Sequence, residues 1–174
     1  MHTVWFTGLP SSGKTTLANA VANKFKFVYN DRQIIILDGD EVRKTLCSDL
    51  GFSEEDRTNN IFRVAQLAKF LNSKGYYVLC SLITPLEINR LQVKCILGDN
   101  VSICFVDCAL DVCKERDIKG LYKKQKEGLM TGLTGVDAPY ERPNNPDISC
   151  NTVFETISES AAKVFEFFTA NHDK

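Results

Sequence analysis

Residues 8–15 read Gly-Leu-Pro-Ser-Ser-Gly-Lys-Thr, a turn bounded by glycines that ends in a lysine and a hydroxyl residue. The turn follows a short apolar run, Thr3 to Thr7, and precedes a stretch with helical spacing, Lys14 to Phe27. Glycines let the backbone curl until its N–H groups face one point, and the helix start adds its positive dipole end. Strand, turn and helix in this order predict a cradle for nucleotide phosphates.

Two side chains at the end of this turn carry the chemical part of the prediction. Lys14 is expected to reach the β and γ phosphates of a nucleoside triphosphate, and Thr15 to offer its hydroxyl to Mg²⁺. A glycine turn that only joins a strand to a helix is the alternative. It does not explain a lysine with a hydroxyl residue beside it at the helix start.

The rest of the chain alternates between short apolar runs and helical patterns. Further strands are predicted at Gln33 to Asp38, Tyr76 to Leu82, Val101 to Asp107 and Ile148 to Val153. Further helices are predicted at Glu41 to Leu46, Glu54 to Lys74, Pro85 to Leu97, Leu110 to Arg116 and Ser158 to Ala170. The alternation predicts an α/β fold of the P-loop NTPase type, a parallel five-stranded sheet with helices on both faces.

One segment, Asp117 to Asp147, interrupts this alternation. It contains four glycines and three prolines and begins with the lysine-rich stretch KGLYKKQK. A structureless run of this length inside a compact domain is usually functional or disordered. Its basic, acidic and aromatic residues indicate a mobile lid, within a single domain that spans residues 1–174.

Composition narrows the classes of partner. The chain has 174 residues, 44% of them apolar, and a formal charge of -1 from 21 basic and 22 acidic residues, so no global field attracts nucleic acid or a membrane. No apolar run reaches the roughly 18 residues of a membrane span, and no signal peptide is evident, which predicts a cytoplasmic protein. Seven cysteines without a C-x-x-C pair predict reduced thiols rather than a zinc site.

Two carboxylates stand close together in the stretch IIILDGDEVR, residues 34–43. Because the carboxyl ends of parallel strands line the ligand crevice, Asp38 and Asp40 are expected beside the phosphates and Mg²⁺. Asp40 is the candidate base for an attacking hydroxyl, and Asp38 the candidate support for Mg²⁺ through water. Two alternatives remain open: Asp40 only caps the next helix, or Asp107, at the end of another apolar run, serves the metal.

Taken in order, several stretches resemble the adenylylsulfate (APS) kinase family. They are VWFTGL (4–9), GKTT (13–16), LDGDEVR (37–43), DLGFSEEDRTNNIFRVAQLAK (49–69), LITP (82–85), VDCALDVCKERDIKGLYKK (106–124) and GLTGVDAPYERPNNP (132–146). The resemblance implies an ATP- and Mg²⁺-dependent kinase that phosphorylates the 3′-hydroxyl of adenosine 5′-phosphosulfate to give 3′-phosphoadenosine 5′-phosphosulfate. It also implies a homodimer.

The resemblance assigns further roles position by position. It implies that ATP is held by Gly8, Leu9, Pro10, Ser11, Ser12, Gly13, Lys14, Thr15 and Thr16. It implies that Asp40 is the base, and that the acceptor nucleotide is bound by Asp40, Arg43, Phe52, Arg57, Asn60, Ile83, Thr84, Lys119, Lys123, Gly132 and Leu133. Without the family context, Arg57 reads as a solvated helix charge and Phe52 as a core residue.

The departures from the family pattern bear on substrate choice. Leu133 stands where the family has a phenylalanine that stacks on the acceptor base opposite Phe52. Stacking on one side only is expected to loosen adenine binding by up to about tenfold. A second hypothesis is therefore a 3′-kinase of a related nucleotide, cytidine diphosphoramidate, in capsule biosynthesis. Thr84 replaces the family's serine, which is phosphorylated in some members.

A hypothesis of a different class is a nucleotide-binding module without catalysis. Such a module is expected to lack a catalytic element. Here the elements are present: Lys14, Thr15, Asp38, Asp40 and the lysine-bearing lid. The sequence therefore favours an enzyme.

Overall fold

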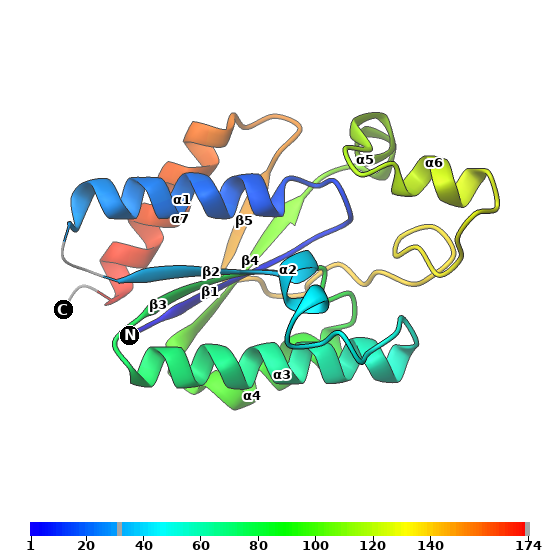
Figure 1. The fold of residues 1–174 in the computed structure, drawn as a ribbon. Coiled ribbons are helices and arrows are strands. Elements are labelled where there is room, and N and C mark those ends of the chain that lie inside the picture. Colours follow the sequence, from blue (N-terminus) through cyan, green and yellow to red (C-terminus); the bar gives the residue numbers. More distant parts are fainter. Residues whose placement is uncertain (31–32, 173–174) are drawn as a thin grey trace.

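The computed structural model describes residues 1–30 and 33–172, without the side chains of residues 171 and 172. Its centre is a sheet of five parallel strands in the order β2-β3-β1-β4-β5. The strands are β1 (Thr3–Thr7), β2 (Ile34–Asp38), β3 (Tyr77–Ser81), β4 (Val101–Asp107) and β5 (Ile148–Asn151). The fold predicted from the sequence is thereby confirmed, with helices on both faces of the sheet (Figure 1).

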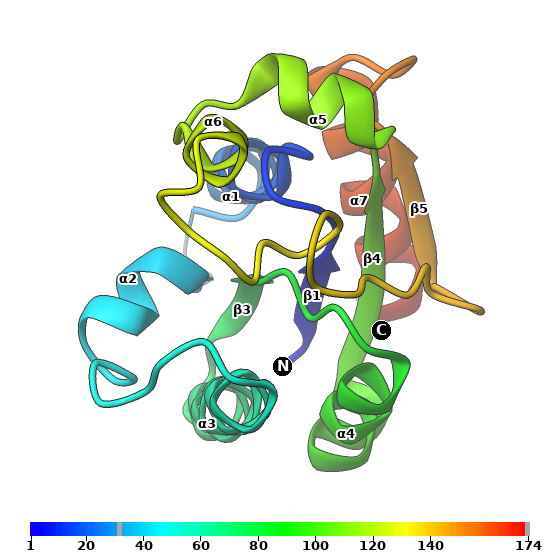
Figure 2. The same cartoon turned by 90° about the vertical axis from the view of Figure 1, so that its right-hand side faces the viewer.

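The helices form two layers. α1 (Lys14–Val28) and α7 (Ile157–His172) cover one face, and α3 (Glu54–Ser73) and α4 (Glu87–Leu97) cover the other (Figure 1). Three short helices, α2 (Gly39–Lys44), α5 (Leu110–Arg116) and α6 (Leu121–Lys126), lie toward the carboxyl ends of the strands (Figures 1 and 2). A 3₁₀ turn at Gly98–Asn100 joins α4 to β4. Among the described residues, no helix is both long and apolar enough to cross a bilayer.

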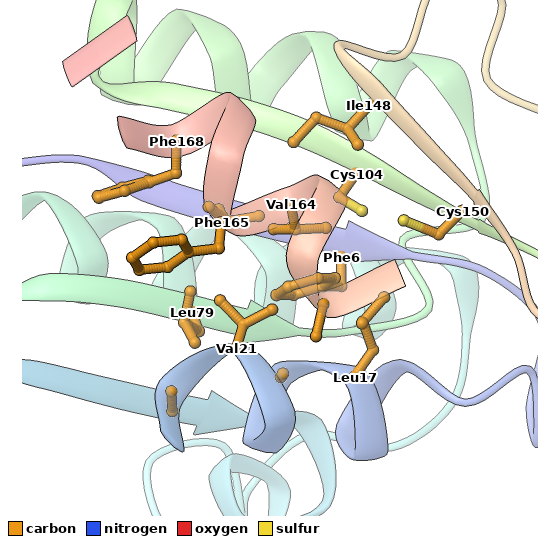
Figure 3. Packing of buried hydrophobic residues seen from close by; sticks show 14 of the residues in the cluster. Phe6, Leu17, Val21, Leu79, Cys104, Ile148, Cys150, Val164, Phe165 and Phe168 are labelled. Carbon is orange, nitrogen blue, oxygen red and sulfur yellow. The ribbon is translucent and has the colours of Figure 1, made fainter. Parts of the chain in front are cut away.

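The alternation of side chains along β1 creates a core on each side of the sheet. Val4 and Phe6 point into the cluster under α1 and α7, which Figure 3 shows around Phe6 and Phe165. Trp5, between them, belongs to the cluster under α3 and α4 with Val64. Burial on both faces explains why the strands read as continuous apolar runs. Burial on both faces also determines where the strands end, and so where the loops that carry the site begin.

The segment 117–147 differs from the sequence prediction of a structureless run, because it contains α6. The carboxylate of Asp117 accepts hydrogen bonds from the backbone N–H groups of Tyr122 and Lys123, at 3.1 and 2.9 Å. Those N–H groups belong to the first turn of the helix, where no intrahelical partner exists. Asp117 therefore stabilises the start of a helix of six residues. The sequence analysis did not predict this helix, because glycines lie close to both of its ends.

Candidate functional site

The turn at residues 8–13 closes tightly between β1 and α1. A Cβ atom at Gly8 would lie 2.6 Å from the carbonyl oxygen of Val106, so only glycine fits there. Gly13 has a φ of 101°, a left-handed conformation that glycine adopts without strain. Both predicted glycines are thus required by the backbone, and the loop brings its N–H groups to the first turn of α1.

Lys14 is folded onto this loop. Its ammonium donates hydrogen bonds to the carbonyl oxygens of Gly8 and Leu9 at 2.9 and 2.8 Å, and the residue is only 9% exposed. Burial, followed by the positive charge of Lys119, lowers the pKa of Lys14 to about 8. An anionic phosphate supplies the counter-charge that this buried ammonium requires.

Thr15, in the first turn of α1, contacts Asp38, at the end of β2. The Thr15 hydroxyl donates to Asp38 Oδ2 at 2.7 Å and lies 3.2 Å from Ser81 Oγ at the end of β3. Hydroxyl and carboxylate oxygens are the ligands that Mg²⁺ prefers, usually alongside water and substrate phosphates. The residues present therefore fit a Mg²⁺ ion between this pair and a bound triphosphate.

The rival carboxylate, Asp107, has another partner. Both of its oxygens accept hydrogen bonds from Arg142, at 3.1 and 2.9 Å. The Arg142 guanidinium also lies 5.0 Å from the ring centroid of Phe105. This fork-to-fork pair fastens the end of the lid to β4, and it leaves Asp38 as the carboxylate that contacts Thr15.

Asp40 lies two residues beyond Asp38 and is not the helix cap. The N-cap of α2 is Asp38, whose Oδ1 accepts a hydrogen bond from the backbone N–H of Asp40 at 2.9 Å. The Asp40 side chain is 57% exposed and forms an ion pair with Lys119 of the lid. Helix capping therefore does not account for Asp40, whose carboxylate faces a lysine from a distant part of the chain.

The predicted acceptor residues gather around the start of α3. Phe52 is 68% exposed, which is incompatible with a core role. The Arg43 guanidinium lies 4.6 Å, and that of Arg57 5.8 Å, from the Phe52 ring centroid. Burial, and for Arg57 also the charge of Arg43, lowers the pKa of both guanidinium groups. Two arginines beside one aromatic ring form a site that attracts an anionic, flat ligand.

Asn60 lies on the buried side of the same helix. Among the described residues, no group hydrogen-bonds to its Oδ1, although the atom is buried. A buried acceptor of this kind is rare in folded proteins and often belongs to a ligand or water site. The observation agrees with the predicted contact between Asn60 and the acceptor, which stays a prediction.

Ile83 and Thr84 follow β3 and are held from three sides. Thr84 has a φ of 44°, which is unusual for a β-branched residue, and its carbonyl oxygen accepts from Arg90 Nη1 at 2.8 Å. Its hydroxyl accepts a hydrogen bond from Trp5 Nε1 at 2.8 Å and is buried. Ile83 is half-buried, and its carbonyl oxygen accepts a hydrogen bond from the Thr7 hydroxyl at 2.6 Å; the contacts of Ile83 and Thr84 with the acceptor remain predictions. The Thr84 hydroxyl is therefore placed as a structural acceptor rather than as a phosphorylation site.

The predicted lid residues lie in different surroundings: Gly132 contacts Arg57, and Leu133 is buried. Gly132 brings its carbonyl oxygen 2.7 Å from Arg57 Nη2. Leu133, by contrast, is 4% exposed and packs with Cys113 and Tyr122 in a third apolar cluster. Lys123 is exposed, and its ammonium lies 4.0 Å from Glu127 rather than at the carboxylates of the crevice. The contacts of Leu133 and Lys123 with the acceptor remain predictions.

The sequence analysis missed one part of the site. A cavity of about 280 Å³ lies beside Gly13 and is lined in part by Arg116 at the end of α5 and Thr152 after β5. Arg116 donates to the Thr152 hydroxyl at 3.1 Å and to its carbonyl oxygen at 2.6 Å. The sequence signals were weak: Thr152 lies near the carboxyl end of the predicted strand Ile148 to Val153, and Arg116 ends the predicted helix after the strand Val101 to Asp107.

Comparisons with known proteins identify the family of the chain. The family model for Adenylylsulphate kinase matches residues 1–151. An adenylyl-sulfate kinase of Halothermothrix orenii is 45% identical over 95% of this chain and 88% of its own length. The Probable adenylyl-sulfate kinase of Synechocystis is 43% identical over 94% and 91% of the two chains. The structure of the Mycobacterium tuberculosis APS kinase in complex with AMPPNP and APS is 38% identical, covers 96% of both chains and gives a TM-score of 0.91. The chain belongs to the adenylylsulphate kinase family.

Proposed function

We propose that this protein transfers the γ-phosphoryl group of ATP to the 3′-hydroxyl of adenosine 5′-phosphosulfate. The observation that carries the proposal is the meeting of two half-sites at one sheet edge. A triphosphate cradle around Lys14 lies on one side, and an aromatic face with two arginines lies on the other. Asp40 lies on α2, which in the sequence comes after the triphosphate cradle and before Phe52. The M. tuberculosis relative, which binds AMPPNP and APS, supports this assignment.

In the proposed reaction, the chain's own groups position the reactants and balance charge. Asp40 accepts the hydrogen bond of the 3′-hydroxyl and aims its oxygen at the γ-phosphorus. Lys119, paired with Asp40 in this structure, is within reach of the transferring phosphoryl group, whose negative charge it and Lys14 offset. Thr15 and Asp38 would hold a Mg²⁺ ion, which would supply positive charge to offset the negative charge of the phosphates. Arg43 and Arg57 hold the anionic end of the acceptor.

The donor base has a matching place. We propose that the adenine of ATP enters the cavity beside Gly13, where the Arg116 guanidinium is held in a fixed plane by Thr152. A planar guanidinium is a favourable surface for stacking by an aromatic base. This position is on the α1 side of the phosphate loop, whereas Phe52 lies at the start of α3 on the other side. Two nucleotides are thereby bound head to head.

Three wider features belong to the same proposal. Residues 1–174 form one kinase domain, with residues 117–147 as a lid that closes over both nucleotides and excludes water. The enzyme acts in the cytoplasm, where ATP is available, and the homodimer implied by the family resemblance is its assembly. The proposed lid contacts the phosphate loop, because the Tyr122 hydroxyl donates to the carbonyl oxygen of Pro10 at 3.0 Å.

A second candidate acceptor is cytidine diphosphoramidate. The observation that favours it is the position of Leu133, whose side chain is buried with Cys113 and Tyr122 and so offers little surface for stacking on a base. A base that stacks on Phe52 alone gains less from a large ring system than one held between two aromatic faces. A pyrimidine acceptor therefore loses less than a purine does at this site.

The kinase proposal is tested by ADP release in the presence and absence of acceptor. We expect ADP to form rapidly only when ATP, Mg²⁺ and adenosine 5′-phosphosulfate are all present, because the acceptor hydroxyl is the nucleophile. ADP release at the same rate without acceptor contradicts the proposal and indicates an ATPase. Binding of ATP without any turnover indicates a nucleotide-binding module.

The Asp38→Asn variant is expected to weaken the apparent affinity for Mg²⁺ by about tenfold, because one charged hydrogen-bond acceptor is removed from the ion's surroundings. Asparagine caps a helix as well as aspartate does, so α2 remains intact. The measurement is the initial rate as a function of Mg²⁺ at saturating nucleotides. Asp107→Asn is the matched control, and it is expected to leave the Mg²⁺ dependence unchanged. The reverse pattern assigns the metal to Asp107.

A further inference from the structure

The tip of the lid, residues 132–138, is a turn that is closed by its own hydrogen bonds. The Leu133 carbonyl oxygen accepts from the N–H groups of Val136, Asp137 and Ala138, at 3.0, 3.2 and 3.1 Å. The Asp137 carboxylate accepts in return from the N–H groups of Gly132 and Leu133, at 2.8 and 2.5 Å. Because these backbone groups find hydrogen-bond partners within the lid tip, we expect residues 132–138 to hold this conformation as one unit.

The lid tip is also fixed against the phosphate loop. Gly135 adopts a φ of 89°, and a Cβ atom there would lie 2.4 Å from Leu9 Cδ2, so the backbone of the lid packs directly on the loop. Leu133, beside it, is buried in the apolar cluster that also contacts Leu9. Burial of these apolar groups holds the lid tip at the donor side of the crevice.

The other side of the lid tip meets Arg57. Arg57 Nη1 donates to the Thr134 hydroxyl at 3.0 Å, and Nη2 donates to the Gly132 carbonyl oxygen at 2.7 Å. Arg57 Nε donates to the carbonyl oxygen of Phe52 at 2.9 Å. Three of the five N–H bonds of the guanidinium are thus used in three directions, which fixes its plane. Thr134, 1% exposed, is the only side chain among these three acceptors.

We propose that Thr134 is a positioning residue for the acceptor nucleotide, because its hydroxyl sets the plane of the Arg57 guanidinium and clasps the lid tip to the acceptor side. The proposal rests on the proposed function, in which Arg57 binds the anionic end of the acceptor. A guanidinium that is held before the ligand arrives loses less conformational freedom on binding. Since the lid tip also packs on Leu9, the clasp joins the acceptor side to the phosphate loop.

The kinetic test replaces the hydroxyl without changing the volume of the side chain. Thr134→Val is expected to raise the KM for adenosine 5′-phosphosulfate about tenfold, because a charged donor loses its partner. The KM for ATP is expected to stay at the wild-type value. Thr134→Ser, which keeps the hydroxyl, is expected to restore the acceptor KM. Thr169→Val on α7 is the matched control, because it makes the same replacement at a hydroxyl that lies outside the crevice and donates to the carbonyl oxygen of Glu166.

Three kinetic outcomes overturn the proposal: an unchanged acceptor KM in Thr134→Val, an equal rise in both KM values, or a serine variant that behaves like valine. A merely structural role predicts the second of these, because loss of the lid tip affects both nucleotides. If the wild-type enzyme shows no turnover with this acceptor, the proposed function is contradicted. The contact between Thr134 and Arg57 is then tested by a measurement that needs no ligand.

Hydrogen exchange of the unliganded protein supplies that measurement. The clasp predicts that Thr134→Val accelerates exchange of the backbone amides in residues 132–138, while the amides of α1 and α7 keep their wild-type rates. Thr134→Ser is expected to exchange at the wild-type rate. Identical exchange in the valine variant and the wild type shows that Thr134 and Arg57 do not hold the lid tip, which overturns the inference whatever the acceptor is.

Discussion

Replacing Asp40 by asparagine is expected to lower kcat by a factor of about 10²–10⁴ while the affinity for ATP stays the same. The amide is close in size to the carboxylate but cannot take a proton from the attacking hydroxyl. The ATP cradle is unaffected, because the contacts of Lys14 and of Thr15 do not involve Asp40. Initial rates and equilibrium binding of an ATP analogue, measured on the same preparation, separate the two effects.

The control for this variant is Asp49→Asn. Asp49 is an exposed carboxylate that, like Asp40, is paired with a basic side chain, in this case Arg63 at 2.6 Å. Its replacement removes a surface ion pair outside the crevice and is expected to leave kcat unchanged. Turnover of Asp40→Asn at the wild-type rate contradicts the role of Asp40 as the base. A loss of ATP affinity equal to the loss of rate assigns Asp40 to nucleotide binding instead.

Replacing Lys14 by methionine is expected to abolish measurable ATP binding and turnover without destabilising the unliganded fold. The ammonium is buried and donates hydrogen bonds to two carbonyl oxygens, which are neutral acceptors, so burial of the charge opposes folding at neutral pH. Methionine fills the same space without that charge. Thermal unfolding and ATP titration of the two proteins at pH 7 check the two halves of this expectation.

The lowered pKa of Lys14 also predicts how its contribution to stability changes with pH. The pKa of Lys14 is lowered from 10.5 to about 8 in the folded protein, so the unfolded chain holds this proton more tightly. The unfavourable contribution of Lys14 to stability is therefore present below pH 8 and disappears as pH rises toward 10.5. The difference in melting temperature between the variant and the wild type should shrink over that range.

ATP binding should follow the opposite course. Only the protonated amine attracts the phosphates, so ATP affinity of the wild type is expected to fall about tenfold per pH unit above pH 8. Glycine-loop contacts that do not titrate are unaffected. Lys14→Met binding ATP as tightly as the wild type contradicts the account of the cradle, and so does a wild-type affinity that is constant between pH 8 and pH 9.5.

Features that depend on neighbouring residues in the chain could be predicted from the sequence. The cradle at residues 8–15 is a local turn between a strand and a helix, so its residues are recognisable without the fold. The pair Asp38 and Asp40 was placed by the rule that parallel strands end at one edge. The structure added that Asp38 caps α2 and contacts Thr15. β1 and β4 have the predicted bounds, because burial on both faces makes their limits sharp.

Features that depend on distant contacts could not be predicted in this way. Arg116 and Thr152 are brought together only by the pairing of β4 with β5. The family resemblance assigns Leu133 to the acceptor site, and the structure adds that its side chain packs beside Tyr122, a contact that the sequence did not indicate. The direction of a lid side chain is decided by the packing of the lid on the phosphate loop, which no local pattern encodes. α6 was missed for a different, local reason, because glycines lie close to both of its ends.

The choice of acceptor base depends on this difference. Phe52 offers one aromatic face, and the lid supplies a buried leucine where a second face was expected from the family. The energy at stake is that of one aromatic contact, roughly 0.5–1.5 kcal/mol, which is small beside the contribution of the phosphate contacts. The 3′-kinase chemistry is therefore expected to be the same with either base.

Initial rates with ATP and Mg²⁺ against matched concentrations of adenosine 5′-phosphosulfate and cytidine diphosphoramidate test the central claim most directly, with the product identified by its phosphorus resonance. The account predicts phosphoryl transfer to the 3′-hydroxyl and a higher kcat/KM for adenosine 5′-phosphosulfate. A higher kcat/KM for cytidine diphosphoramidate contradicts the adenine acceptor and makes Leu133 a specificity residue. If neither nucleotide is phosphorylated, the proposed kinase activity is contradicted.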